Sequence, residues 1–178
     1  MHLKYIGIFA LLLFTGKSLI AQTFPTDPDN QKITYQETVE IEGQDQNEIF
    51  EKTRKWLEVY FSNKEKVKED KEKSEVSRKG SFEVIITYDY RYKHKHTVLF
   101  NMSIAQKDGK YRYTLTDFSI YDNKNDEKSA VPLETFYQKQ RHQNKTELYK
   151  NFNKEMTSLL EALQQAVESG EIKDEDDW

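Results

Sequence analysis

The sequence of 178 residues contains no cysteine, only three prolines and only six glycines. The absence of cysteine excludes disulfide bonds, thiol nucleophiles and cysteine-ligated metals. The spacings typical of a serine-hydrolase elbow, a zinc-protease helix or a phosphate-binding loop do not occur in the sequence. No long apolar run follows the first 21 residues, so no later segment is expected to span a membrane. The sequence therefore has no familiar catalytic signature, and no cofactor is expected.

Charge is abundant, and its balance is acidic. Lysine and arginine total 27 residues against 31 aspartates and glutamates. Removal of residues 1–21 deletes Lys4 and Lys17, which leaves 25 basic against 31 acidic side chains, a formal charge near −6. Binding to nucleic acid depends on a basic surface that neutralises phosphates. The composition therefore argues against nucleic acid as a partner.

The first 21 residues have the pattern of a secretory signal peptide. A short basic start, MHLK, precedes the apolar run YIGIFALLLF, and Ala21 offers a small residue before Gln22. The apolar run is shorter than the ~20 residues that a spanning helix needs. The pattern predicts an exported protein, periplasmic or secreted, and the alternative is an uncleaved N-terminal anchor. We expect an exposed arm at 22–31, one domain at 32–169 and a disordered acidic tail at 170–178.

The first half of the domain predicts a strand, a helix and an edge strand. Apolar residues alternate with polar ones over 32–42, which is typical of a half-buried strand. Residues 46–62 carry apolar side chains at helical spacing, after a capping Asp45 with Glu48 three residues later. The highly charged segment 65–80 predicts a short edge strand, a turn near Asp70–Lys73 and the start of a longer strand.

Two hairpins are expected in the middle of the chain. Apolar residues occupy even positions before and after the run YDYRYKHKH at 88–96, so an odd-length loop centred near His94 would pair Tyr88 with Phe100 and Tyr90 with Val98. On this interpretation Tyr92 also belongs to the buried row.

Asp108-Gly109 is a strong signal for the second hairpin. It would pair Ile104 with Tyr113. The apolar parity then changes, which predicts a β-bulge near Thr116–Asp117.

Helices are expected to complete the domain. A polar loop at 123–130 precedes a short helix opened by Pro132, and a final helix spans about 145–169 before Gly170. The element order is strand, helix, four strands and helices. This order favours a two-layer α+β fold, in which an antiparallel sheet of about five strands carries helices on one face.

Two segments resemble a known family. They are KITYQETVEIEGQDQNEIFEKTRKWL and AQKDGKYRYTLTDFSIYD, within a stretch from about Pro25 to Asp122. They look like domain of unknown function 4468, a family of exported Bacteroidota proteins assigned a TBP-like fold. The resemblance implies a curved antiparallel sheet with helices. It implies no catalytic or binding residues, and a fold does not determine a function.

Few residues suggest chemistry. His94 and His96 would share one face of a strand, but zinc sites use three or four protein ligands, so solvated histidines at a hairpin tip are the preferred interpretation. Segment 122–127 lacks the glycine and the final glutamate of a calcium loop. Asp117, at the expected bulge, is the weak catalytic candidate, because an inward carboxylate there could have a raised pKa.

The outward sheet face supplies the weak binding candidates. It is expected to be polar except for Ile85 and Leu99. We therefore expect a non-enzymatic binding or interaction domain, with an envelope protein as one partner to consider and the oligomeric state open. The alternatives are an envelope hydrolase that uses carboxylates and a carrier of a small apolar ligand between sheet and helices.

Overall fold

The computed structural model describes residues 23–61, 65–89 and 91–170. The predicted signal peptide and all but the first residue of the predicted tail lie outside these ranges. The elements, in chain order, are β1 (Tyr35–Glu40), α1 (Gln46–Tyr60), β2 (Lys68–Asp70), β3 (Glu75–Tyr88), β4 (Tyr92–Lys107), β5 (Lys110–Asp122), the 3₁₀ turn η1 (Glu127–Ser129), β6 (Val131–Pro132), α2 (Leu133–Lys139) and α3 (His142–Ser169).

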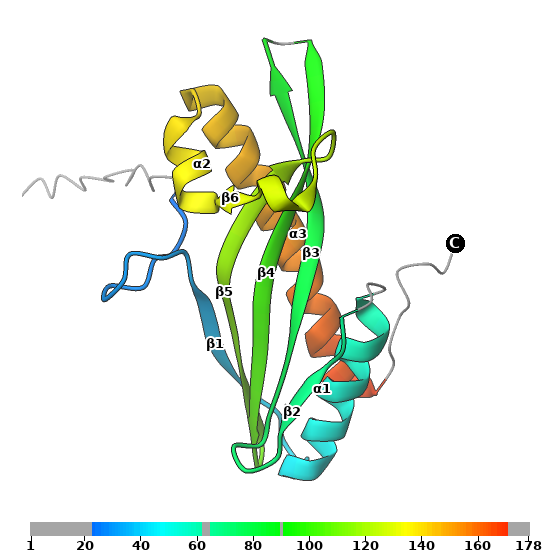
Figure 1. Cartoon of the computed structure of the whole chain (residues 1–178). Helices are drawn as coiled ribbons and strands as arrows, with labels where there is room; N and C mark the ends of the chain where they lie inside the picture. Colours follow the sequence, from blue (N-terminus) through cyan, green and yellow to red (C-terminus); the bar gives the residue numbers. More distant parts are fainter. Residues whose placement is uncertain (1–22, 62–64, 90, 171–178) are drawn as a thin grey trace, which may run out of the picture.

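The strands form one antiparallel sheet in the order β1-β5-β4-β3-β2, and β6 adds a short pairing to β5. The chain therefore passes from one edge of the sheet to the other between β1 and β2, and α1 makes that crossing. Helices α1 and α3 lie on the same face of the sheet, and within the described residues neither of them covers the opposite face (Figure 1). This two-layer α+β arrangement is the one that the element order predicted.

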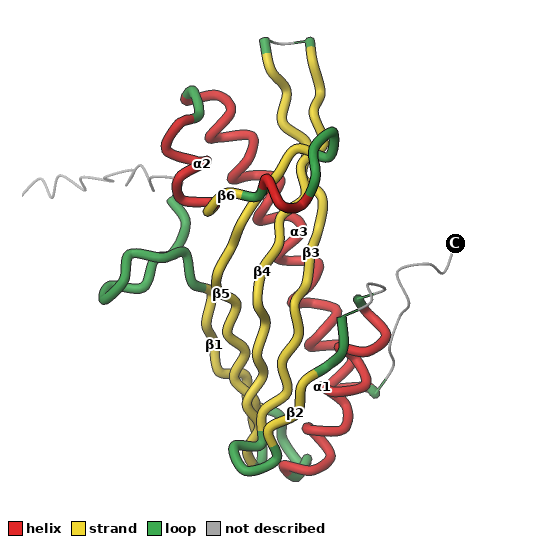
Figure 2. The backbone as a smooth tube through the Cα atoms, viewed as in Figure 1, coloured by secondary structure: helices red, strands yellow, loops and turns green. Residues whose placement is uncertain are grey.

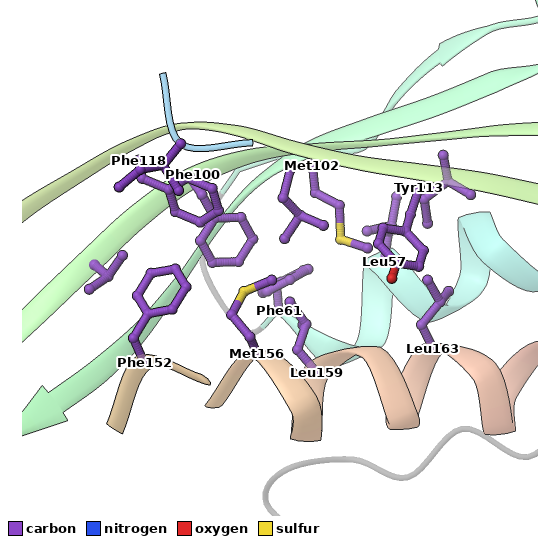
Figure 3. Packing of buried hydrophobic residues seen from close by; sticks show 14 of the residues in the cluster. Leu57, Phe61, Phe100, Met102, Tyr113, Phe118, Phe152, Met156, Leu159 and Leu163 are labelled. Atoms are coloured by element: carbon purple, nitrogen blue, oxygen red, sulfur yellow. The ribbon is translucent and has the colours of Figure 1, made fainter. Parts of the chain in front are cut away.

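The core lies between the sheet and helix α3. Figure 3 shows side chains of the sheet and side chains of α3 pointing toward one another. Rings from β1, β3 and β5 meet around Phe152, whose ring centroid lies 5.8 Å from that of Tyr35, 5.2 Å from that of Phe82 and 5.3 Å from that of Phe118. The contribution from α3 is the helical stripe Leu148, Phe152, Met156, Leu159 and Leu163, all buried.

The second hairpin follows the prediction. Met102 pairs with Leu115 and Ile104 with Tyr113 across β4 and β5. The register shifts between Leu99 and Asn101, and Asp117 on the opposite strand has a positive φ of 54°. The change in apolar parity had placed the bulge at this position.

The first hairpin corrects the sequence prediction. Its loop is odd in length, but it is centred on position 90 and not on His94, because Tyr88 pairs with Tyr92. Tyr88 therefore does not pair with Phe100, which faces Gly80 instead. Strand β4 begins at Tyr92 and includes both histidines. Tyr92 is 63% exposed and is not part of the buried row.

The helix ends agree with their sequence signals. The Asp45 carboxylate accepts a hydrogen bond from the Glu48 amide at 2.9 Å, and Gly170 ends α3 with φ 74°. Helix α3 begins at His142, three residues before the expected start. Strand β6 was not expected from the sequence.

At one edge of the sheet, the short strand β2 pairs with only the first residues of β3 (Figure 2). The free edge of β3 is partly covered by β2 and by side chains of α3. Glu147 accepts a hydrogen bond from the Thr87 amide at 2.8 Å, and Asn151 donates one to the Ile85 carbonyl at 2.6 Å. Such side chains discourage pairing with another strand.

Candidate functional site on the uncovered sheet face

The face of the sheet opposite the helices is hollowed. A groove of about 760 Å³ crosses it from β2 to β5, and η1 contributes to one end. It is lined by Glu65, Lys66, Lys68, Lys79, Gly80, Ser81, Thr97, Leu99, Phe100, Asn101, Asp117, Ser119, Tyr121 and Glu127. A second hollow of about 380 Å³ continues it along the sheet and shares Glu65, Lys66, Lys68, Lys79 and Asn101.

One aliphatic side chain lies in the middle of a polar groove floor. Leu99 of β4 pairs with Ser81 of β3 on one side and with Ser119 of β5 on the other. Successive side chains on one face of a strand are two residues apart, so Thr97 and Asn101 lie above and below Leu99. The floor therefore offers hydroxyl and amide groups around one aliphatic side chain.

The wall of the groove near β2 is basic. Lys66 and Lys68 line both hollows, and within the described part of the chain neither has a carboxylate oxygen within 4.0 Å. Acidic side chains line the groove as well: Glu65 lies beside Lys66 in the lining of both hollows, and Asp117 and Glu127 line other parts. The groove therefore has charge of both signs, with two lysines available to an anionic group.

Asp117 is anchored by two donors at the bulge. The Lys32 ammonium lies 2.9 Å from one carboxylate oxygen, and the Asn101 amide donates to the other at 2.9 Å. The hydrogen bond from Lys32 is the largest cause of a lowered pKa for Asp117, and the hydrogen bond from Asn101 lowers this pKa further. The direction is opposite to the raised pKa that was considered for a catalytic acid. Asp117 joins β5 to Lys32, the residue that follows the N-terminal arm, and its carboxylate is ionised near neutral pH.

A family model matches the part of the chain that builds this face. The model is described as "Domain of unknown function (DUF4468) with TBP-like fold", and it matches residues 35–121. The match runs from the start of β1 almost to the end of β5. This segment is a DUF4468 domain.

Two crystal structures resemble the DUF4468 fold seen here. A TBP-like protein from Parabacteroides distasonis is 21% identical with a TM-score of 0.62, over 80% of this chain and 96% of its own. A DUF4468 family protein from Bacteroides ovatus is 11% identical with a TM-score of 0.62, over 83% of this chain and 91% of its own. At these identities the likeness shows the fold alone. No curated protein matches the chain.

The two apolar candidates of the outward face are separated in the DUF4468 domain. Leu99 lines the groove, whereas Ile85 lies outside its lining and is 40% exposed. The pair formed by Glu83 and Thr97 lies between them on the sheet, and Glu83 forms a 3.0 Å ion pair with Lys95. Ile85 and Leu99 therefore do not form one contact patch.

The two histidines lie on the helix-facing side of the DUF4468 sheet and not in the groove. His96 is buried, and the Nδ1 atom of His94 lies 2.9 Å from the Asp122 carboxylate. Burial lowers the pKa of His96. The described residues contain no group of three histidine, aspartate or glutamate side chains that could hold a metal ion. The expectation of solvated tip histidines was wrong, because both residues lie within β4.

Several groove residues were missed at the sequence level. Tyr121 could have been found, because the parity after the bulge places Ser119 and Tyr121 on the outward face. Lys66, Lys68 and Glu127 come from segments distant in sequence, and no local pattern brings them to the groove.

Among the helices of the described residues, none combines the length and hydrophobicity that crossing a bilayer requires.

Proposed function

We propose that the chain is an exported, non-enzymatic binding domain that receives its partner in the groove of the uncovered sheet face. The observation that carries this proposal is the hollow of about 760 Å³ with Leu99 at the centre of a polar floor. Ligand sites are concave and combine apolar contact with a few placed polar groups. The shape and lining of the groove fit this description.

The lysines of the wall indicate the charge of the partner. Lys66 and Lys68 have no carboxylate within 4.0 Å among the described residues, so a partner can pair with them without breaking an existing ion pair. A carboxylate-bearing segment of an envelope protein satisfies them and places an apolar group on Leu99. The ionised, doubly anchored Asp117 supports binding over acid catalysis.

Export rests on the sequence pattern of residues 1–21. If the proposal is correct, the protein purified from the periplasm or the medium of its host begins at Gln22 or within a few residues of it. Mass spectrometry of the intact protein measures this directly. A mature protein that still carries residues 1–21 in a cytoplasmic fraction contradicts the export part of the proposal.

The binding part is tested with a matched pair of variants. Leu99→Gln removes the apolar group from the groove, and Ile85→Gln makes the same change on the same sheet face outside the groove. We expect Leu99→Gln to abolish cross-linking to the partner in native envelope, and Ile85→Gln to leave it unchanged. Thermal unfolding of both variants shows that each is folded.

A photo-cross-linker sharpens the location. Placed at Ser119 in the groove, it should yield a specific adduct in envelope preparations, and placed at Ile85 it should not. The adduct at Ser119 should weaken when both Lys66 and Lys68 are replaced by glutamine. Equal labelling from Ser119 and Ile85, or adducts that do not respond to Leu99→Gln, would overturn the groove as the binding site.

A further inference from the structure

Strand β1 has an open hydrogen-bonding edge. The Ile41 amide donates to the Gly109 carbonyl at 2.8 Å, so these two residues continue the register of the β1–β5 ladder at a hydrogen-bonded position just past its last pair, Glu40–Lys110. In an antiparallel ladder such pairs alternate, so Tyr35, Glu37 and Val39 also bond to β5. The amides and carbonyls of Gln36, Thr38 and Glu40 therefore point away from the sheet.

These edge groups have no partner within the described part of the chain. Strand β1 is at the end of the sheet order, and no hydrogen bond reaches the outward backbone groups of Gln36, Thr38 or Glu40. The N-terminal arm covers this edge as far as Thr34, whose amide donates to the Pro25 carbonyl at 3.0 Å. The free edge of β3, in contrast, is capped by Glu147 and Asn151.

A groove runs beside the open edge. It has a volume of about 450 Å³ and lies between β1 and helix α3. Val39 and Leu160 line it as half-buried apolar side chains, and the buried rings of Tyr111 and Tyr113 lie at its base. A strand added to β1 would direct every second side chain into this groove. The open edge of β1 therefore lies beside a groove that can receive the side chains of an added strand.

The charge of the groove identifies the occupant. Glu37, Glu40 and Glu161 line it, no lysine, arginine or histidine does, and none of the three glutamates is in an ion pair among the described residues. Burial keeps the pKa of Tyr113 raised, so its hydroxyl stays protonated and donates to Glu37 at 2.6 Å. This contact fixes the Glu37 carboxylate beside the edge.

We propose that the edge of β1 binds an extended, basic segment of a partner polypeptide by strand addition, with alternate lysine and aliphatic side chains of that segment in the groove against α3. Main-chain hydrogen bonds to Gln36, Thr38 and Glu40 supply the affinity, and the carboxylates select the sequence. The site is separate from the groove of the opposite sheet face. A second copy of the chain is disfavoured, because pairing two β1 strands brings their glutamates together.

The probe is a capped eight-residue peptide that alternates threonine with lysine or valine, and its counterpart with glutamate in place of lysine. We expect the basic peptide to bind the full-length protein, more weakly as salt is raised, and the acidic one to bind at least tenfold more weakly. In hydrogen exchange followed by NMR, the amides of Gln36, Thr38 and Glu40 should become protected. The Val39 amide, already bonded to β5, should change little.

Backbone methylation tests the strand itself. All amides on one side of an added strand belong to alternate residues. Methylating the amides of one alternate set should abolish binding, and methylating the other set should preserve it. Equal effects of the two sets would overturn strand addition, and this test needs no variant of the protein.

A matched pair of variants locates the site. Thr38→Pro removes the central amide of the open edge. An edge strand tolerates proline at this position, because the amide that is lost makes no hydrogen bond to β5. Thr38→Val keeps the amide. We expect about a tenfold or greater loss of peptide affinity for Thr38→Pro and little change for Thr38→Val.

Leu99→Gln, on the opposite face, should not affect the peptide, so this site and the groove proposed above fail independently. A dimer that forms without peptide and is lost in Thr38→Pro would overturn the foreign segment in favour of a second copy. Binding of the acidic peptide equal to that of the basic one would also overturn the proposal.

Discussion

At the scale of single residues, two buried positions in the sheet, Gly80 and His96, make predictions about stability that can be measured. Gly80 of β3 faces Phe100 of β4, and Phe61 after α1 lies against the same point. A Cβ at this position would meet ring atoms of Phe100 at 2.6 Å and of Phe61 at 2.7 Å. Both rings are buried and cannot move aside without disturbing the core.

Gly80→Ala is therefore expected to destabilise the domain by about 1–3 kcal/mol. The substitution also restricts the unfolded chain, which stabilises by about 0.4–1 kcal/mol, so the net effect remains destabilising. Urea unfolding measures the difference. Ser81→Ala, on the exposed side of the same strand, serves as the control and should change stability by less than about 0.5 kcal/mol. A Gly80→Ala protein as stable as the wild type would show that the rings of Phe61 and Phe100 can move aside without loss of stability.

The second position is His96, which is 3% exposed and has its pKa lowered by burial. The nearby Asp122 carboxylate favours the charged ring, but burial outweighs it. Between the lowered folded pKa and the unfolded value near 6.5, the unfolded chain binds more protons than the folded one. Stability should therefore fall as the pH drops below about 6.5.

His96→Phe should remove this dependence. Between pH 7.5 and 5.5 the wild type should lose more unfolding free energy than the variant. The exposed His142 provides the control, because His142→Gln should keep the wild-type pH profile. Parallel profiles for the wild type and His96→Phe would contradict the assignment of the pH dependence to His96.

At the scale of elements, local chemistry determined what could be predicted from the sequence. Asp108-Gly109 demands one tight turn, and so the β4–β5 register was correct. The β3–β4 register was wrong because any odd-length loop keeps both apolar rows on one face. Loops centred on position 90 and on His94 thus satisfy the same pattern. The groove was not predicted, because Lys66 and Glu127 reach it from separate segments.

The end of α1 shows how a charge in an apolar row can be structural. Arg78 occupies a buried position of β3, and its guanidinium donates to the Leu57 and Glu58 carbonyls near the C-terminus of α1. A positive charge is stabilising at the C-terminus of a helix, where the last carbonyls have no helical hydrogen-bond donors. Arg78→Met should destabilise the domain by about 1.5–3 kcal/mol in urea unfolding. Lys55→Met, on the exposed side of α1, should have a small effect, and equal losses would contradict the capping role.

At the scale of the whole molecule, helix α3 connects elements that lie far apart in the sequence. Phe152 is fully buried, and its ring contacts Phe24 of the arm, Tyr35 of β1, Phe82 of β3 and Phe118 of β5, with centroids 4.9–5.8 Å away. The C-terminal half of α3 packs on α1. Because one helix joins both ends of the sheet, the domain should unfold as a single unit.

Phe152→Ala should therefore cost about 3–5 kcal/mol and lower the stability of every element together. In a Trp178→Phe background Trp56 is the remaining tryptophan. Its fluorescence reports on α1, and circular dichroism reports on the whole fold. The two unfolding curves should coincide in both the parent and the Phe152→Ala protein, at a lower urea midpoint in the latter. Phe136→Ala, in α2, should shift the midpoint less, because among the described residues this half-buried ring has one aromatic neighbour, His96. Separate transitions for Trp56 and for the dichroism would show that α1 unfolds independently of the sheet.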